Sequence, residues 1–211
     1  RRLSIIQTGA DGKLSSVAEV ELSGNVHGLF LNGDSLTVVS DWDNSQDRSR
    51  TSRVDVSIFD VSDRSNPVRN SQTVFDGDFQ TARQIGDDVY LVLRQRGFSV
   101  PQPRRIYEPN ADGTGEIVRY QTEAEYRASL NALFDRNPVP QQYSVSDEDG
   151  SVVLTSDGLL IDSQQLIDNA MVGNGWSGTQ LTTIVSIDAG AADGGSDGAS
   201  VVSDTVTVEG H

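Results

Sequence analysis

Val54-Asp-Val-Ser-Ile-Phe-Asp-Val-Ser-Asp-Arg-Ser-Asn-Pro67 is the stretch that decides the fold of this 211-residue chain. The residues from Val54 to Asp60 alternate between apolar and polar side chains, which is typical of a β-strand with one buried face. The Ser, Asp, Asn and Pro residues that follow favour a tight turn. The apolar residues between Val68 and Phe75 then predict a second strand. The stretch therefore predicts one strand-turn-strand corner of a β-sheet.

Matching glycines and strand residues recur around this corner at a constant offset of 53 residues. Each copy reads as a strand, a two-residue Gly-Asp turn and another strand, because glycine tolerates the positive φ of such turns. The matched positions are Ile6 with Phe59, Gly24 with Gly77, Gly33 with Gly86, Asp34 with Asp87, and Val38 with Leu91. A fixed period indicates a repeated sheet unit. Without its polar insert, 41–53, the unit is roughly 40 residues long, as propeller blades are.

The repeat predicts an all-β fold, a β-propeller fragment of about two and a half four-stranded antiparallel blades. The whole chain, 1–211, is expected to form this partial propeller domain. The remaining blades are expected outside this chain, which means either that the full protein is longer or that this piece pairs with another one. The predicted strands are Leu3–Thr8 and Val17–Leu22; then Val26–Leu31, Ser35–Ser40, Val54–Asp60 and Val68–Phe75; then Phe79–Ile85, Val89–Leu93, Thr182–Asp188 and Val201–Val208.

A long insertion, 94–180, interrupts the last predicted blade and carries a predicted helix at 122–135. Thr122 and Glu125 have the spacing of a capping box at the start of this helix. Its apolar face consists of Tyr126, Leu130, Leu133 and Phe134. A small hairpin is expected between 151–155 and 159–161, with its turn at Ser156-Asp-Gly158.

Composition excludes several classes of function. Sixteen Lys and Arg residues against 31 Asp and Glu residues give a net charge of −15, which repels nucleic acids and anionic membranes. No apolar run approaches the roughly 20 residues that span a bilayer. The chain has no cysteine, which rules out disulfides and thiolate metal sites. We therefore expect neither nucleic-acid binding nor a membrane span.

The chain resembles the secreted C-terminal β-propeller domain family of bacteria and archaea, which is distantly related to WD-type repeats. The resemblance lies in Val56-Ser-Ile-Phe-Asp-Val-Ser-Asp-Arg-Ser-Asn-Pro67, in Gly77-Asp-Phe, in Ile85-Gly-Asp-Asp-Val-Tyr-Leu-Val92 and in Leu181–Asp188. It implies a propeller fold and a bacterial protein that is secreted or held in the cell envelope. The family has no generally assigned activity, so the resemblance transfers no catalytic residue.

Two acidic loops carry oxygen ligands at the short spacings that calcium requires. Neither contains the complete calcium-loop pattern, and the alternative is a solvated turn in an acidic protein. The candidate calcium ligands are Asp41, Asp43 and Asp47 in the first loop, and Asn110, Asp112 and Glu116 in the second. Apart from calcium, the sequence predicts no cofactor.

Aromatic residues in the insertions give a candidate surface for binding a protein or a glycan: Trp42, Tyr107, Tyr143 and Trp176. The alternative is that these rings anchor the insertions to the sheets. The only histidines are His27, in a predicted strand, and the terminal His211, and no nucleophile elbow is present. The sequence thus favours a non-enzymatic binding or scaffold module. The second hypothesis is a carbohydrate-active hydrolase or lyase that uses carboxylates such as Asp41 and Asp43.

Overall fold

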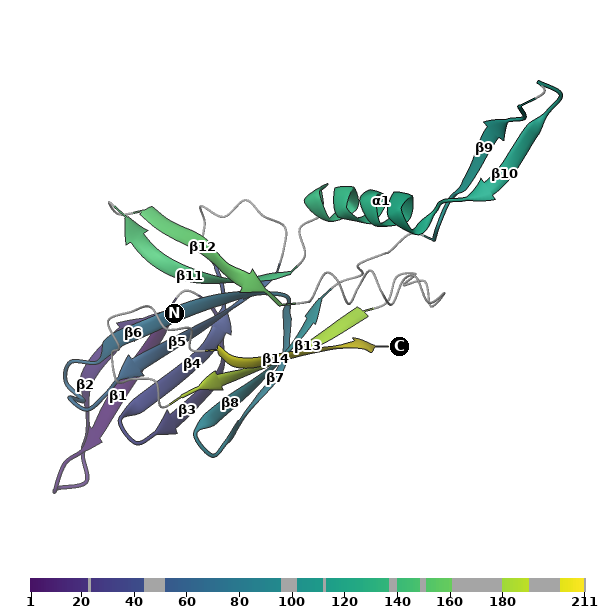
Figure 1. Ribbon diagram of the computed structural model, residues 1–211. Helices are drawn as coiled ribbons and strands as arrows, with labels where there is room; N and C mark the ends of the chain where they lie inside the picture. Colours follow the sequence, from purple (N-terminus) through teal and green to yellow (C-terminus); the bar gives the residue numbers. More distant parts are fainter. Residues whose placement is uncertain are drawn as a thin grey trace.

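The computed structural model describes residues 1–22, 24–43, 52–95, 102–111, 113–136, 140–148, 151–160, 180–189 and 202–210. These residues form antiparallel sheets and one short helix, so the predicted all-β class is confirmed (Figure 1). Trp176, Asp47, Asp112 and His211 lie outside the described residues.

Two four-stranded antiparallel blades have the strand order that the repeat predicts. The first blade consists of β3 (Val26–Asn32), β4 (Ser35–Asp41), β5 (Arg53–Asp60) and β6 (Val68–Asp76). The second blade consists of β7 (Asp78–Ile85), β8 (Asp88–Gln95), β13 (Gln180–Asp188) and β14 (Val202–Gly210). A separate two-stranded sheet precedes them, formed by β1 (Arg2–Thr8) and β2 (Leu14–Glu21). The strand β2 begins three residues earlier than predicted, because a bulge at Val17 of β2 lets Leu14, Ser15 and Ser16 continue the pairing with β1.

The 53-residue repeat places glycines at matching positions of the two blades. Gly33 and Gly86 occupy the two-residue turns with φ of 58° and 63°. A Cβ added to Gly24 would lie 2.1 Å from the carbonyl oxygen of Asp41, and one added to Gly77 would lie 3.4 Å from that of Arg94. Asp41 and Arg94 are themselves one period apart. The close approach therefore requires glycine at position 24, whereas at position 77 it is the φ of 131° that favours glycine.

The main core lies between the two blades, where the apolar faces of their sheets pack together. It contains Val39, Val54, Val56, Ile58 and Phe75 of the first blade and Val89, Leu91, Leu93, Leu181, Val185 and Ile187 of the second. A smaller cluster on the opposite face of the first blade packs it against β1 and β2 through Leu22, Val38, Phe59 and Val61. Successive side chains along the strands of the first blade therefore point into two different cores, one on each face of the sheet. As a result, three sheets stack face to face.

The insertion contains two hairpins and the predicted helix. Its elements are β9 (Arg105–Pro109), β10 (Glu116–Tyr120), α1 (Glu123–Arg136), β11 (Gln141–Glu148) and β12 (Ser151–Leu159). The helix places Tyr126 and Leu130 in the main core, where they are 2% and 0% exposed. The side chain of Phe134 lies outside the described residues. No helix in the described ranges is long and apolar enough to cross a membrane.

The hairpin predicted around Ser156-Asp-Gly158 is wrong. The strand β12 runs through these residues and pairs with β11, and the bulge opposite Gln142 and Tyr143 takes up Asp157. Ser144 Oγ donates to the Asp157 carboxylate at 3.1 Å. The turn signal therefore marks a bulge inside a strand. β11 also pairs with β6, which extends the first blade to six strands in the order β12-β11-β6-β5-β4-β3.

Candidate functional site

The hairpin β9–β10 projects beyond α1, away from the stacked sheets (Figure 1). We call this hairpin, 105–120, the arm. Its strands pair in register from Arg105 with Tyr120 to Pro109 with Glu116. The connecting turn is closed by backbone hydrogen bonds from Asn110 to Gly115 at 2.7 Å and from Gly113 to Asn110 at 2.9 Å. Gly113 has a φ of 74°, which favours glycine there.

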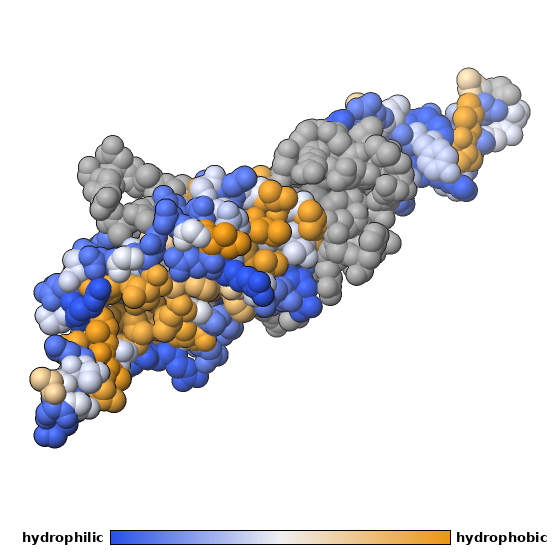
Figure 2. Space-filling view, turned by 90° about the horizontal axis from the view of Figure 1, so that it is seen from below, coloured by the Kyte–Doolittle hydropathy of each residue, from blue (hydrophilic) through white to orange (hydrophobic). Residues whose placement is uncertain are grey.

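One face of the arm presents large side chains to solvent. Tyr107 and Val118 are directly opposite each other, and Tyr120 lies on the same face two residues further along β10. Tyr107 is 60% exposed, Val118 52% and Tyr120 60%. Figure 2 shows an apolar strip on this projecting part of the surface, separate from the apolar area over the sheets. Exposed tyrosines of this kind are enriched at protein interfaces.

Arg105 completes this face at the base of the arm. Its guanidinium carbon lies 5.6 Å from the centroid of the Tyr120 ring, a cation–π geometry. Its Nε also donates to the Tyr120 hydroxyl at 3.3 Å. The hydrogen bond and charge interaction with Tyr120 raise the pKa of Arg105 above its usual value. Tyr120 is thus held in place while its ring stays exposed.

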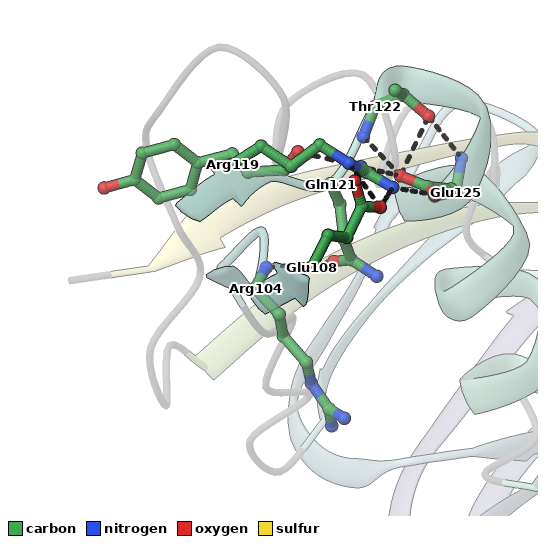
Figure 3. Close-up of polar contacts among 7 residues, drawn as sticks. Arg104, Glu108, Arg119, Gln121, Thr122 and Glu125 are labelled. Carbon is green, nitrogen blue, oxygen red and sulfur yellow. Dashed lines mark hydrogen bonds and ion pairs between the residues drawn. The ribbon is translucent and has the colours of Figure 1, made fainter. Parts of the chain in front are cut away.

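Arg119, on the opposite face of β10, joins the arm to the helix (Figure 3). Its Nη2 donates to Glu108 Oε1 of β9 at 2.6 Å, and its Nη1 donates to Glu125 Oε2 of α1 at 2.7 Å. The hydrogen bond from Arg119 is the main cause that lowers the pKa of Glu125 to about 2. Both carboxylates raise the pKa of Arg119 in turn. One guanidinium therefore ties both strands of the arm to the first turn of α1.

The same carboxylate of Glu125 caps the helix, as the sequence predicts. Thr122 Oγ1 accepts from the Glu125 N–H at 3.3 Å, and Glu125 Oε2 accepts from the Thr122 N–H at 2.8 Å. Arg104 and Gln121 close the base of the arm with two further bonds of 2.9 Å. Since Tyr126 and Leu130 bury the helix in the core, the arm has a continuous support from the sheets to its exposed face.

Trp42 lies in a different region, after the end of β4. Its backbone N–H donates to the carbonyl of Arg53 at 3.0 Å, and its partly buried side chain lines two hollows. Asp41, next to it, uses Oδ1 to contact His27 Nε2 at 2.6 Å and Oδ2 to accept from Asn25 at 3.1 Å. The His27 ring stacks on Phe79 of the second blade, with centroids 4.2 Å apart. The carboxylate of Asp41 therefore takes part in the contact between blades.

Of the other two predicted binding aromatics, Tyr143 faces the first blade. The guanidinium carbon of Arg53 lies 4.9 Å from the centroid of its ring. Burial is the main cause that raises the pKa of the Tyr143 hydroxyl, with the nearby Asp76 carboxylate second. These contacts are the ones expected if the Tyr143 ring anchors the insertion to the sheet. Trp176 lies outside the described residues.

The predicted calcium ligands lie partly outside the described residues, at Asp47 and Asp112. Asp43 is exposed beside Trp42, and Asn110 and Glu116 flank the turn of the arm. Within the ranges that the structure describes, no three His, Cys, Asp or Glu side chains gather closely enough to hold a metal ion. Calcium binding at these loops stays a prediction.

On the exposed face of the arm, sequence reasoning identified only Tyr107, and it missed Arg105, Val118, Tyr120 and the ion pairs of Arg119. The available signal is the alternation in Arg105–Glu108 and Glu116–Tyr120 on either side of a Gly-rich turn. Such alternation indicates a hairpin with two distinct faces. The alternation does not show whether another sheet covers either face of the hairpin.

Comparison with known proteins gives one match. A family model described as "Beta propeller domain" matches residues 1–208. No curated protein matches the chain, and no solved structure does.

Proposed function

Since this chain belongs to the beta-propeller domain family, we propose that it is a non-enzymatic binding module whose arm engages a protein partner. The observation that carries the proposal is the exposed face of Tyr107, Val118 and Tyr120 on a projecting, braced hairpin. Large exposed side chains on a held backbone lose little conformational freedom on binding, which favours affinity. A protein partner is favoured over a glycan because the tyrosines stand on a projecting hairpin with the apolar side chain of Val118 beside them.

The proposal includes an extracellular location. The resemblance to a secreted propeller family supports a bacterial protein that is exported or held in the cell envelope. The acidic composition, with a net charge of −15, is compatible with that setting because it maintains solubility without a nucleic-acid or membrane partner. Fractionation of the native cells with an antibody against this chain tests the location, and recovery in the cytoplasm contradicts it.

A further blade is the second partner that we propose, packed on the outer face of the second blade. Val92, Ile184 and Val206 form a cross-strand row on that face, where Ile184 is 38% and Val206 51% exposed. The equivalent row of the first blade includes Val39 and Val56, which the second blade buries to 0% and 1% exposed. In the first blade this row is covered by the next blade. The repeat therefore supports a further blade that covers the equivalent row of the second blade in the same way.

A photo-crosslinking residue at position 118, introduced into the protein in its native host, tests the arm. We expect covalent capture of one protein, whose affinity for the purified chain is then measured. Tyr107→Ser and Tyr120→Ser together should weaken that affinity by at least about 2 kcal/mol, as hot-spot truncations do.

Leu14→Ser is the matched control for this experiment, because Leu14 is 69% exposed on a different hairpin. It should leave the affinity unchanged. Equal crosslinking from positions 14 and 118, or unchanged binding by the double tyrosine variant, would overturn the assignment of the arm.

A further inference from the structure

The exposed face of the arm has its charged residues at opposite ends. Arg105 lies at the base of the arm, at the start of β9, and Glu116 lies at the tip, at the start of β10. Both side chains belong to the same face as Tyr107 and Val118, because paired residues of an antiparallel ladder point to one side and successive pairs alternate. The face therefore has a positive base, an uncharged middle and a negative tip.

These two charges are not neutralised within the part of the chain that the structure describes. There, neither Arg105 nor Glu116 has an ion-pair partner, and the Arg105 guanidinium lies over the Tyr120 ring instead. Arg119, on the opposite face, is by contrast paired with two carboxylates. The exposed face thus offers one cation and one anion to another molecule.

The charge pattern is self-complementary about the middle of the arm. The pair Tyr107–Val118 is the third of five in the ladder. A two-fold axis that crosses both strands at this pair, between two facing arms, places the tip of each arm over the base of the other and each strand over its own counterpart. Glu116 of one copy then lies over Tyr120 of the other, which is where the Arg105 guanidinium is held.

From this symmetry we propose that the arm binds the arm of a second copy of this chain, face to face and antiparallel. The proposal rests on the function proposed for the arm, and it names the partner. At the centre, Tyr107 packs against Tyr107 of the second copy and Val118 against Val118, so that the exposed apolar and aromatic surface is buried. An ion pair between Arg105 and Glu116 of the other copy closes each end.

The antiparallel arrangement also keeps the acidic parts of the two chains apart. Each chain has a net charge of −15, so two copies repel each other wherever their stacked sheets come close. The arm projects away from those sheets (Figure 1). Packing tip over base therefore leaves the two sets of sheets at opposite ends of the paired arms, whereas packing base over base would bring them together. Salt at physiological concentration screens charges beyond about 8 Å.

We expect a weak, reversible dimer, because strands of five residues give a small interface. Sedimentation velocity of the full chain over a range of micromolar concentrations tests this expectation. The mean mass should rise from that of one chain toward twice that value. The dissociation constant should be on the order of 10 µM, since small interfaces are typical of transient contacts.

Charge reversal tests whether the arm is the surface that associates. Arg105→Glu and Glu116→Arg each bring like charges together at both ends of the dimer, and each should weaken self-association by at least about tenfold. In an equimolar mixture of the two variants, the mixed dimer regains an opposite-charge pair at both ends. The mixture should therefore associate about as tightly as the parent chain, which misfolded variants could not do.

Arg2→Glu and Glu19→Arg are the matched controls, because these exposed residues pair on another hairpin and their reversal changes the net charge equally. Each control should associate like the parent chain. A parent chain that stays monomeric overturns the proposal, as do charge variants of the arm that associate like the parent or that fail to associate when mixed. If a monomeric chain still captures a different protein through position 118, only the proposed partner is wrong; if it captures nothing, the function proposed for the arm fails as well.

Discussion

The hydroxyl of Tyr143 donates a hydrogen bond of 3.0 Å to Oδ2 of Asp76, which precedes it by 67 residues. The same oxygen accepts from the backbone N–H of Gln141 at 3.0 Å, and Oδ1 accepts from Arg53 Nε at 2.8 Å. The side chains of Arg53 and Asp76 are only 12% and 10% exposed. One nearly buried carboxylate at the end of β6 therefore fastens both β5 and the inserted strand β11.

Removing that carboxylate should destabilise the fold far more than removing the hydroxyl. Asp76→Ala leaves the buried guanidinium of Arg53 without this partner and should cost about 3–5 kcal/mol. Tyr143→Phe removes one hydrogen bond and should cost about 1 kcal/mol. Urea unfolding measures both, with Tyr107→Phe on the exposed arm as the neutral control. Equal costs for the two variants contradict this account.

Arg119→Gln should loosen the arm without unfolding the blades. The chain has no cysteine, so spin labels at Thr114→Cys and Ser62→Cys report the distance between the arm and the first blade. The distance distribution should be narrow in the parent protein and broad in the variant. Arg127→Gln, which removes an ion pair with Glu123 within the same helix, serves as the matched control. A narrow distribution in Arg119→Gln would show that other contacts brace the arm.

Acid should loosen the arm in the same way. The folded pKa of Glu125 is lowered to about 2 from an ordinary value of 4.5. A lowered carboxylate pKa stabilises the folded state above the ordinary value, and that contribution is lost as pH falls toward the folded pKa. The spin-label distribution should therefore broaden between pH of about 4.5 and about 2. The Glu125→Gln variant should lack this transition, and its persistence there would assign the effect to another group.

Gly24→Ala should destabilise the protein strongly. The new Cβ would overlap the carbonyl oxygen of Asp41 at 2.1 Å, and the backbone must shift to relieve it. We expect a cost of about 1–3 kcal/mol, the typical range of overpacking effects. A Cβ at Gly115 meets nothing within 4 Å, so Gly115→Ala should be nearly neutral. Thermal unfolding of both variants checks the difference, which a wild-type-like Gly24→Ala would disprove.

Calcium titration checks the sequence-based prediction for the loops at 41–47 and 110–116. A site there should raise the thermal midpoint in excess calcium, because a ligand that binds only the folded state stabilises it. Chelator should reverse the increase, and Asp43→Ala or Asn110→Ala should abolish it for the respective loop. An unchanged midpoint, together with no calcium in the purified protein, would refute both sites.

The blades could be predicted from sequence because their signals are local and repeat. Alternation around Phe59 and the paired turn glycines Gly33 and Gly86 specify strands, turns and register within one unit. The strand β11 could not be predicted, because Gln141-Gln-Tyr-Ser contains little apolar alternation and its pairing partner lies 67 residues away. The two hollows that Trp42 lines were also hidden, since their lining comes from separate segments whose proximity only the tertiary fold creates.

The return of β11 to β6 has a consequence for modularity. The chain builds the first blade, starts the second with β7 and β8, goes back to widen the first, and only then adds β13 and β14. In a simple repeat array each unit is made from one continuous segment, so units can be lost or duplicated individually. Here the two blades are interlaced, and a break between β8 and β11 would leave neither complete. We therefore expect them to fold, unfold and be inherited as a pair.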